Sequence, residues 1–154
     1  MRGGVVVIAA TVLLLAACGG GSSRLSAGAY RTQLLKIKQQ SNAAEGQVVK
    51  GLQAKSIPEL RKRLDDFAAT SQRIGDEVAK LKAPKNAEAA NAELAQGEKD
   101  TATATRAASA AVAKLKTPQA AISYLQHSLA NAKGSRELDD SITKLKQLGY
   151  TSGS

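Results

Sequence analysis

From residue 27 onward, mainly apolar side chains, with a few small polar ones, recur at alternating steps of four and three residues. The clearest run is Leu60, Leu64, Phe67, Ser71, Ile74, Val78 and Leu81. This spacing aligns side chains on one face of an α-helix, in the a and d positions of a heptad repeat. The other runs are Tyr30, Leu34, Ile37, Ser41, Ala44, Val48 and Leu52; Leu94, Thr101, Thr105, Ala108, Val112 and Leu115; and Ile122, Leu125, Leu129, Ala132, Leu138, Ile142 and Leu145. The pattern predicts helices that each bury one face.

Three prolines mark the starts of the later helices, because a proline in a first turn lacks only an N–H that has no helical partner. They are Pro58, Pro84 and Pro118, and Ser56 with Glu59 matches a capping box before the first of them. The resulting segments are 27–55, 56–83, 84–117 and 118–149. Helices of similar length joined by short connections fold back on one another. We therefore expect an all-α fold, an antiparallel up-down-up-down four-helix bundle.

Two features of the later segments refine this expectation. The heptad spacing shifts at Gly134 and Ser135, which predicts a kink in the last helix near Gly134, with Ser135 able to cap its second half. The third run consists mostly of small side chains, and each Leu replaced by Ala forgoes about 2 kcal/mol of burial. Small side chains also let helices approach closely. We expect a narrow, dry bundle with little room for a large ligand cavity.

The N-terminal residues follow a different pattern. After a single basic residue, Arg2, an apolar-rich run extends from Val5 to Leu15. The run is shorter than the roughly 20 residues that a helix needs to cross a bilayer, and it fits the hydrophobic region of a signal peptide. We therefore assign residues 1–17 to an N-terminal signal helix that is excluded from the fold.

Cys18 is the only cysteine and follows this run directly. It cannot form a disulfide within the chain, and only one histidine is present to join it at a zinc site. The tetrad Leu15-Ala16-Ala17-Cys18 resembles the lipobox of bacterial lipoproteins. This resemblance implies export, attachment of a diacylglyceryl group to Cys18 and cleavage between Ala17 and Cys18. The alternative is an ordinary secretory peptide whose removal leaves Cys18 as a free thiol.

The chain thus divides into a signal peptide at 1–17, a flexible Gly/Ser tether at 18–26, a helical bundle at 27–149 and a disordered tail at 150–154. The whole pattern resembles small, Ala- and Lys-rich helical lipoproteins of bacterial envelopes, notably those of high-GC Gram-positive bacteria. The resemblance implies a protein held by lipid on the extracytoplasmic face of the cell membrane, without enzymatic residues.

The charge of the chain bears on its partners. Lys and Arg number 22 against 13 Asp and Glu, a formal net charge of +9. Several lysines fall at helix C-termini, where they complement the helix dipole, and these ends alternate between the two poles of an antiparallel bundle. Aromatic residues make up only 3% of the chain, which disfavours a nucleic-acid surface. An anionic lipid, an anionic wall polymer or an envelope protein is the expected partner, with plain solvation of the lysines as the alternative.

The titratable residues form no pattern that predicts catalysis, a cofactor or a metal. His127 is expected to face solvent, away from the buried face of its helix. The adjacent or nearby carboxylates are expected on solvated helix faces, some of them in ion pairs. They are Asp65 with Asp66, Asp139 with Asp140, and Glu93 with Glu98. Cys18, as a lipid attachment point, is the one predicted site residue.

Two functions fit these observations. The first is a non-enzymatic binding or scaffold module of the cell envelope, which acts through exposed helix faces. The second is a carrier or sensor accessory that binds a small apolar ligand between its helices. A hydrophobic cavity facing Phe67, Ala104 and Ala108 favours the second function, and a tightly filled core favours the first.

Overall fold

The computed structural model describes residues 23–51, 53–130 and 132–151. Over these ranges the chain is all-helical, as predicted, and contains no strand. Its elements are α1 (Ala27–Gly51), α2 (Ile57–Lys80), the short 3₁₀ helix η1 (Lys85–Ala87), α3 (Glu88–Val112), α4 (Pro118–Ala130) and α5 (Lys133–Gln147). The predicted signal peptide, Cys18 and residues 19–22 of the tether lie outside the described residues, as do Leu52 and residues 152–154.

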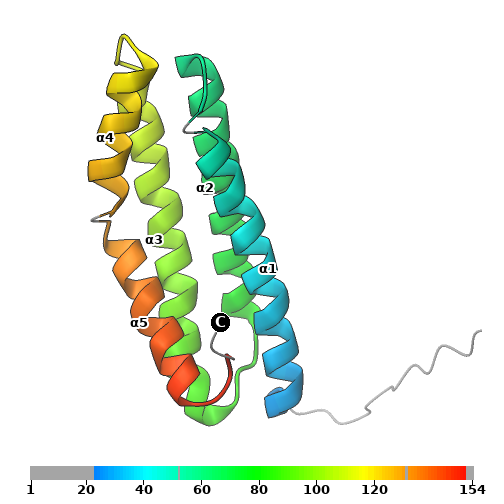
Figure 1. Cartoon of the computed structure of the whole chain (residues 1–154). Helices are drawn as coiled ribbons and strands as arrows, with labels where there is room; N and C mark the ends of the chain where they lie inside the picture. Colours follow the sequence, from blue (N-terminus) through cyan, green and yellow to red (C-terminus); the bar gives the residue numbers. More distant parts are fainter. Residues whose placement is uncertain (1–22, 52, 131, 152–154) are drawn as a thin grey trace, which may run out of the picture.

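Figure 1 shows three long helices side by side, with α4 and α5 following one another along α3. The backbone of α1 packs along α2, α2 packs along α3, and α3 in turn receives α4 and α5. No comparable backbone packing joins α1 to α4 or α5 in the described part of the chain. The fourth predicted segment is therefore two helices, and α1 and α5 stand at opposite sides of the α2–α3 pair.

The interruption in the fourth segment lies just before Gly134, close to the predicted kink, whereas the predicted cap at Ser135 is wrong. Helix α4 ends at Ala130, α5 begins at Lys133, and the N-cap of α5 is Ala132 rather than Ser135. Gly134 is buried within α5, where a Cβ atom would come within 2.5 Å of the backbone nitrogen of Thr101. Glycine is present here because α5 and α3 approach closely, and the chain has already turned before it.

Two clusters of buried side chains form the core. The proximal cluster, named for its position near residue 23 where the described chain begins, comprises Tyr30, Leu34, Ile37, Ile74, Val78, Ala83, Ala87, Ala90, Leu94, Ala95, Leu145 and Tyr150. The distal cluster comprises Ala54, Leu60, Leu64, Ala108, Val112, Ala121 and Leu125. The core is thus divided between the two ends of the helices.

The proximal end also carries hydrogen bonds between side chains of different helices. The Tyr30 hydroxyl donates to Asn91 Oδ1 at 3.0 Å, and Asn91 Nδ2 donates to the carbonyl oxygen of Val78 at 3.0 Å. The ring of Tyr150 meets that of Tyr30 edge-on, with centroids 5.1 Å apart, while its hydroxyl donates to Asn86 Oδ1. Tyr150 is buried, so the predicted boundary between the bundle and its tail at residue 149 lies too early.

The predicted buried faces are mostly correct, with one exception on α5. Ile142 is 47% exposed, whereas its neighbour Ser141 is fully buried and donates to the carbonyl oxygen of Leu138 at 2.8 Å. Between Leu138 and Leu145 the alternation of three and four residues fits Ser141 and Ile142 equally well, so the spacing alone does not show which of the two is buried.

Candidate functional site

Between the two clusters, polar side chains replace apolar ones on the inward faces of three helices. Ser41 on α1, Ser71 on α2 and Glu98 on α3 lie at this level, and Thr105 follows Glu98 two turns further along α3. The first three helices therefore change from an apolar to a polar interior in the middle of the molecule. We call this set the polar layer.

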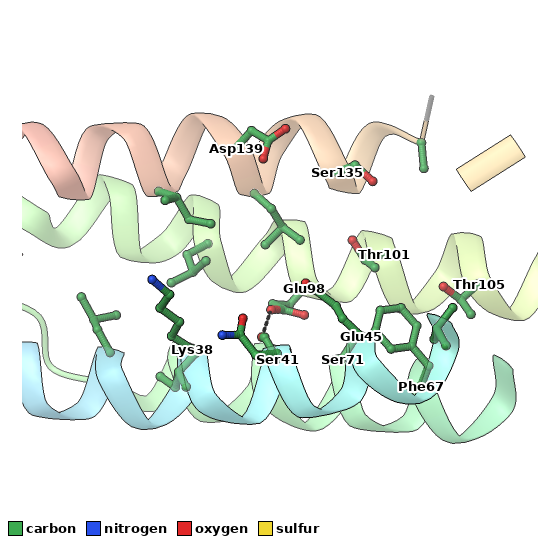
Figure 2. Close-up of a pocket in the computed structure, with 18 of the residues that line it drawn as sticks. Lys38, Ser41, Glu45, Phe67, Ser71, Glu98, Thr101, Thr105, Ser135 and Asp139 are labelled. Carbon is green, nitrogen blue, oxygen red and sulfur yellow. Dashed lines mark hydrogen bonds between the residues drawn. The ribbon is translucent and has the colours of Figure 1, made fainter. Parts of the chain in front are cut away.

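A groove opens at the polar layer, and its volume of 630 Å³ lies within the range of about 300–1,000 Å³ typical of small-ligand sites. Helices α1 and α5 form its walls, while side chains of α2 and α3 line it from below (Figure 2). It is partly open to solvent. The expectation of a dry bundle with little room for a large ligand cavity is wrong for this part of the molecule.

The groove exists because its walls are not packed against each other. Ser41, Ser71 and Ala104 fill less space than the Leu or Ile residues found at equivalent positions of the other heptad turns. Because these small side chains do not fill the space between α1 and α5, a gap remains there. Two large apolar residues at the groove consequently remain in contact with water. Val49 on α1 is 63% exposed and Ile142 on α5 is 47% exposed.

Glu98 is the buried charge-bearing residue of the groove, with 5% of its surface exposed. The Ser41 hydroxyl donates to Glu98 Oε1 at 3.0 Å, shown as the dashed line in Figure 2. No Lys or Arg of the described residues forms an ion pair with this carboxyl group. Burial raises its pKa above the usual value, and hydrogen bonds from Ser41 and Ser71 only partly offset this. A carboxyl group in such surroundings lacks a counter-charge.

Two threonine hydroxyls stand on the same helix. Thr101 and Thr105 follow Glu98 by three and seven residues, a spacing that places all three side chains on one face of α3. Both threonines line the groove, and the Oγ1 atom of each is buried with no hydrogen-bond partner. Buried hydroxyls normally have hydrogen-bond partners, and a buried hydroxyl without one costs about 1–3 kcal/mol of stability. The groove thus contains hydrogen-bonding groups with unused capacity.

The other predicted carboxylates lie on exposed helix faces, as expected. Asp66 pairs with Lys62 at 2.7 Å and Glu93 pairs with Lys144 at 2.6 Å, while Asp65, Asp139 and Asp140 are exposed. Glu98 contradicts the expectation, because it is buried. The signal was present in the sequence: Glu98 follows Leu94 by four residues and precedes Thr101 by three, so it occupies a position of the buried face.

Of the remaining residues singled out in the sequence, Phe67 and Ala104 line the groove, and His127 and Ala108 do not. His127 is exposed, as expected, and its Nδ1 atom lies 2.8 Å from the carbonyl oxygen of Ser123. Cys18 lies outside the described residues. Ala108 belongs to the distal cluster. Across the described ranges, no three His, Cys, Asp or Glu side chains gather closely enough to hold a metal ion, and no helix combines the length and apolarity needed to cross a bilayer.

Comparison with protein-family models, with curated proteins and with solved structures finds no match to this chain.

Proposed function

We propose that this protein is a lipid-anchored, non-enzymatic envelope protein whose helical domain binds a small apolar ligand in the groove between α1 and α5. The observation that carries the proposal is the groove itself, which interrupts the core where a scaffold has no need of a gap. Of the two functions that fit the sequence, the carrier or sensor accessory needs such a space. In this proposal the helices act as an up-down-up-down bundle of four segments, with α4 and α5 together as the fourth.

The apolar lining supplies the driving force for binding. Leu34, Ile37, Leu138 and Ile142 line the groove, and part of this surface is in contact with water in the unliganded protein. An apolar ligand gains about 25 cal/mol for each Å² of such surface that it covers. Helices α1 and α5 have no close backbone packing on each other along the groove, which leaves space for a ligand between them.

The anchor at Cys18 supports a location at the extracytoplasmic face of the membrane. Arg24 donates to the carbonyl oxygen of Ala83 at 3.0 Å, and the N–H of Leu25 donates to that of Lys82 at 2.8 Å. These bonds hold the start of the described chain at the connection between α2 and η1. Six residue steps separate Cys18 from Arg24, so the proximal end stays within about 20 Å of a lipid attached at Cys18.

The same geometry favours anionic lipid headgroups as a second binding partner. Lys80, Lys82 and Lys85 are exposed at the α2–η1 connection, next to the residues that lead to Cys18. None of them forms an ion pair within the described residues. Lysines close to an anionic membrane surface contribute about 1 kcal/mol each. We propose that they orient the domain with its proximal end toward the bilayer.

Methyl NMR tests the ligand proposal. The full chain, processed in a bacterial host and reconstituted in lipid nanodiscs, is titrated with octan-1-ol as an uncharged probe. We expect concentration-dependent shifts of the Ile37 and Ile142 methyl signals, and none at Leu64 or Val112 of the distal cluster. Ala104→Phe, which fills the groove, should abolish the shifts, whereas Ala110→Phe at an exposed site on the same helix should preserve them. Absence of saturable shifts at the groove methyls overturns the proposal.

Membrane fractionation tests the anchor. Cys18→Ser removes the sulfur that carries the lipid, so the variant should leave the membrane pellet and lose the incorporation of labelled palmitate. Retention of both in the variant contradicts the anchor. The lysines are tested in the Cys18→Ser chain, so that the lipid anchor does not hold the protein on the membrane. There, the triple Lys80, Lys82 and Lys85→Gln variant should lose binding to anionic vesicles, and the double Lys114 and Lys116→Gln variant at the far pole should keep it. Contact that persists unchanged at high salt contradicts the electrostatic orientation.

A further inference from the structure

We propose that the ligand of the groove is an amine with an apolar body, and that its ammonium group pairs with the carboxylate of Glu98. This inference rests on the proposed function and names the chemical class of the ligand. It depends on three observations about the groove. These are a buried carboxyl group without a counter-charge, threonine hydroxyls without partners on the same helix, and an apolar lining on the proximal side of Glu98.

The first observation is the charge of the lining. Glu45, Glu98 and Asp139 contribute three carboxyl groups, against the two lysines Lys38 and Lys146, although the whole chain has a formal net charge of +9. The lining therefore contains one carboxyl group more than it has lysines, in a protein whose overall charge is strongly positive. Glu98 is the deepest of the three, because Glu45 and Asp139 are exposed. Charge complementarity favours a positively charged ligand group here.

The second observation is the set of oxygen atoms available to that group. An ammonium group has three N–H donors and no acceptor. The carboxylate of Glu98 and the Oγ1 atoms of Thr101 and Thr105 present acceptors along one face of α3, and both hydroxyls are without partners. Thr105 is completely buried. A cation at Glu98 gives the carboxylate a counter-charge, and Thr101, one turn along α3, is close enough to accept from another of its donors. Thr105 lies about 10 Å from Glu98 along the helix, too far to contact the same ammonium group.

The third observation is the direction in which the ligand body extends. On the proximal side of Glu98 the groove is lined by Leu34, Ile37, Leu138 and Ile142, which come from both walls. An unbranched or slender apolar chain attached to the amine can lie between these walls. The ligand is thus amphipathic, with its cationic end at the polar layer and its apolar end toward the proximal cluster.

The opposite ligand classes fit less well. A carboxylate ligand would face a buried carboxyl group, and burial of an uncompensated like charge is costly. An alcohol can hydrogen-bond with the threonines but leaves Glu98 without a counter-charge. Among ligands of equal apolar size, the amine is therefore the one that gains from Glu98.

The experiment compares three probes of equal chain length: octylamine, octan-1-ol and octanoate. Each is titrated into the full chain in nanodiscs, and binding is read from the Ile37 and Ile142 methyl shifts against the measured free probe concentration. We expect octylamine to bind about tenfold more tightly than octan-1-ol, because hydrogen bonds to charged groups are worth about 1.5–3 kcal/mol. Octanoate should bind most weakly.

Glu98→Gln identifies the group responsible. It preserves the shape of the side chain and an acceptor for Ser41, so octan-1-ol binding should stay within twofold while octylamine loses its advantage. Glu45→Gln is the matched control, since it removes an equal charge at an exposed groove residue. Because the bilayer is the same for every variant, uptake of a given probe by lipid cancels in the comparison between variants.

The outcomes separate this inference from the proposed function. If octan-1-ol binds as tightly as octylamine, or if Glu98→Gln leaves the preference intact, the amine assignment is wrong while the groove remains a binding site. If Glu45→Gln removes the preference as fully as Glu98→Gln, the preference arises from overall charge and the assignment of Glu98 is wrong. If no probe shifts the groove methyls, both proposals fail.

Discussion

The proximal and distal ends of the molecule are held together by different means. At the proximal end, α1, α2, α3 and α5 all contribute buried residues, and a hydrogen-bonded set around Tyr30, Asn91 and Tyr150 joins them. Burial there raises the pKa of Tyr30 to about 12. The distal cluster contains only aliphatic side chains and Ala, mainly from α2, α3 and α4. One end has specific polar contacts between helices, and the other relies on burial alone.

This difference explains why the groove lies where it does. The proximal contacts fix α1 and α5 relative to α3, and the distal cluster fixes α4 to α2 and α3. Between them the polar layer supplies neither large apolar side chains nor ion pairs to draw α1 toward α5. A groove can thus occur in a small domain when both of its ends are closed by buried residues.

The largest expected effect is the loss of the central aromatic residue of the proximal end. Tyr30→Ala should lower the free energy of unfolding by about 4 kcal/mol, as expected for the truncation of a buried aromatic side chain. Tyr30→Phe, which keeps the ring but leaves Asn91 Oδ1 without its donor, should cost about 1–2 kcal/mol. Urea unfolding of the chain from residue 23 onward measures both. A near-neutral Tyr30→Ala would show that the hydrogen-bonded set does not stabilise this end.

A matched pair of leucine truncations tests whether the two ends are independent. Leu125→Ala in α4 and Leu145→Ala in α5 each remove a buried side chain and should each cost about 3 kcal/mol. Hydrogen exchange should distinguish them, with Leu125→Ala exposing α4 and the adjoining turns of α2 and α3 while the proximal amides stay protected. Identical exchange patterns in the two variants would contradict a division into two stabilising regions.

Serine caps provide a finer comparison of the same kind. Ser56 caps α2 at the distal end by accepting from the N–H of Glu59 at 3.3 Å, and Ser26 accepts from the N–H of Ala29 near the proximal start of α1 at 3.2 Å. Each Ser→Ala substitution should cost about 1 kcal/mol. Local amide exchange should rise in the first turn of the affected helix. A larger loss at Ser26 than at Ser56 would indicate that α1 depends on its cap more than on its packing.

The smallest expected effect is on the pH dependence of stability and arises from Glu98, in the polar layer between the two ends. Because the pKa of Glu98 is raised in the folded state, the folded protein keeps its proton at pH values where the unfolded chain has lost it. This residue therefore lowers stability as the pH rises through its folded pKa, and its contribution is most favourable in acid. Relative to the wild type, Glu98→Gln should gain stability between acidic and neutral pH. Parallel stability profiles of the two proteins would show that Glu98 is not desolvated.

Most of the fold could be predicted from the sequence, because it depends on local rules. Heptad spacing placed Leu60, Leu64, Ile74 and Val78 in the core, and the Ser56 cap with Pro58 gave the start of α2 correctly. The break before α5 lies close to the predicted position, but the sequence could not show that Gly134 allows a close approach to Thr101 rather than a bend. Ile142 was assigned to the buried face because the spacing fits Ser141 and Ile142 equally well.

The site was harder to predict than the fold. Ser41 and Ser71 were placed on inward faces, but nothing in a sequence pattern shows that such residues lie at one level in space. Glu98 was treated as part of a solvated face because carboxylates are rarely buried, although its spacing matched the buried positions. The groove depends on the separation of α1 from α5, which arises from long-range packing that no local spacing encodes.

The bonds of Arg24 and Leu25 to the α2–η1 connection have a mechanical consequence. Helix α1 carries the chain toward the N-terminus and also forms one wall of the groove. A pull applied before residue 24 reaches the backbone of Lys82 and Ala83, and the Arg24–Glu88 ion pair, before it reaches α1. Tension applied to the chain before residue 24 is therefore transferred to the α2–η1 connection and to the start of α3, rather than to the groove wall formed by α1.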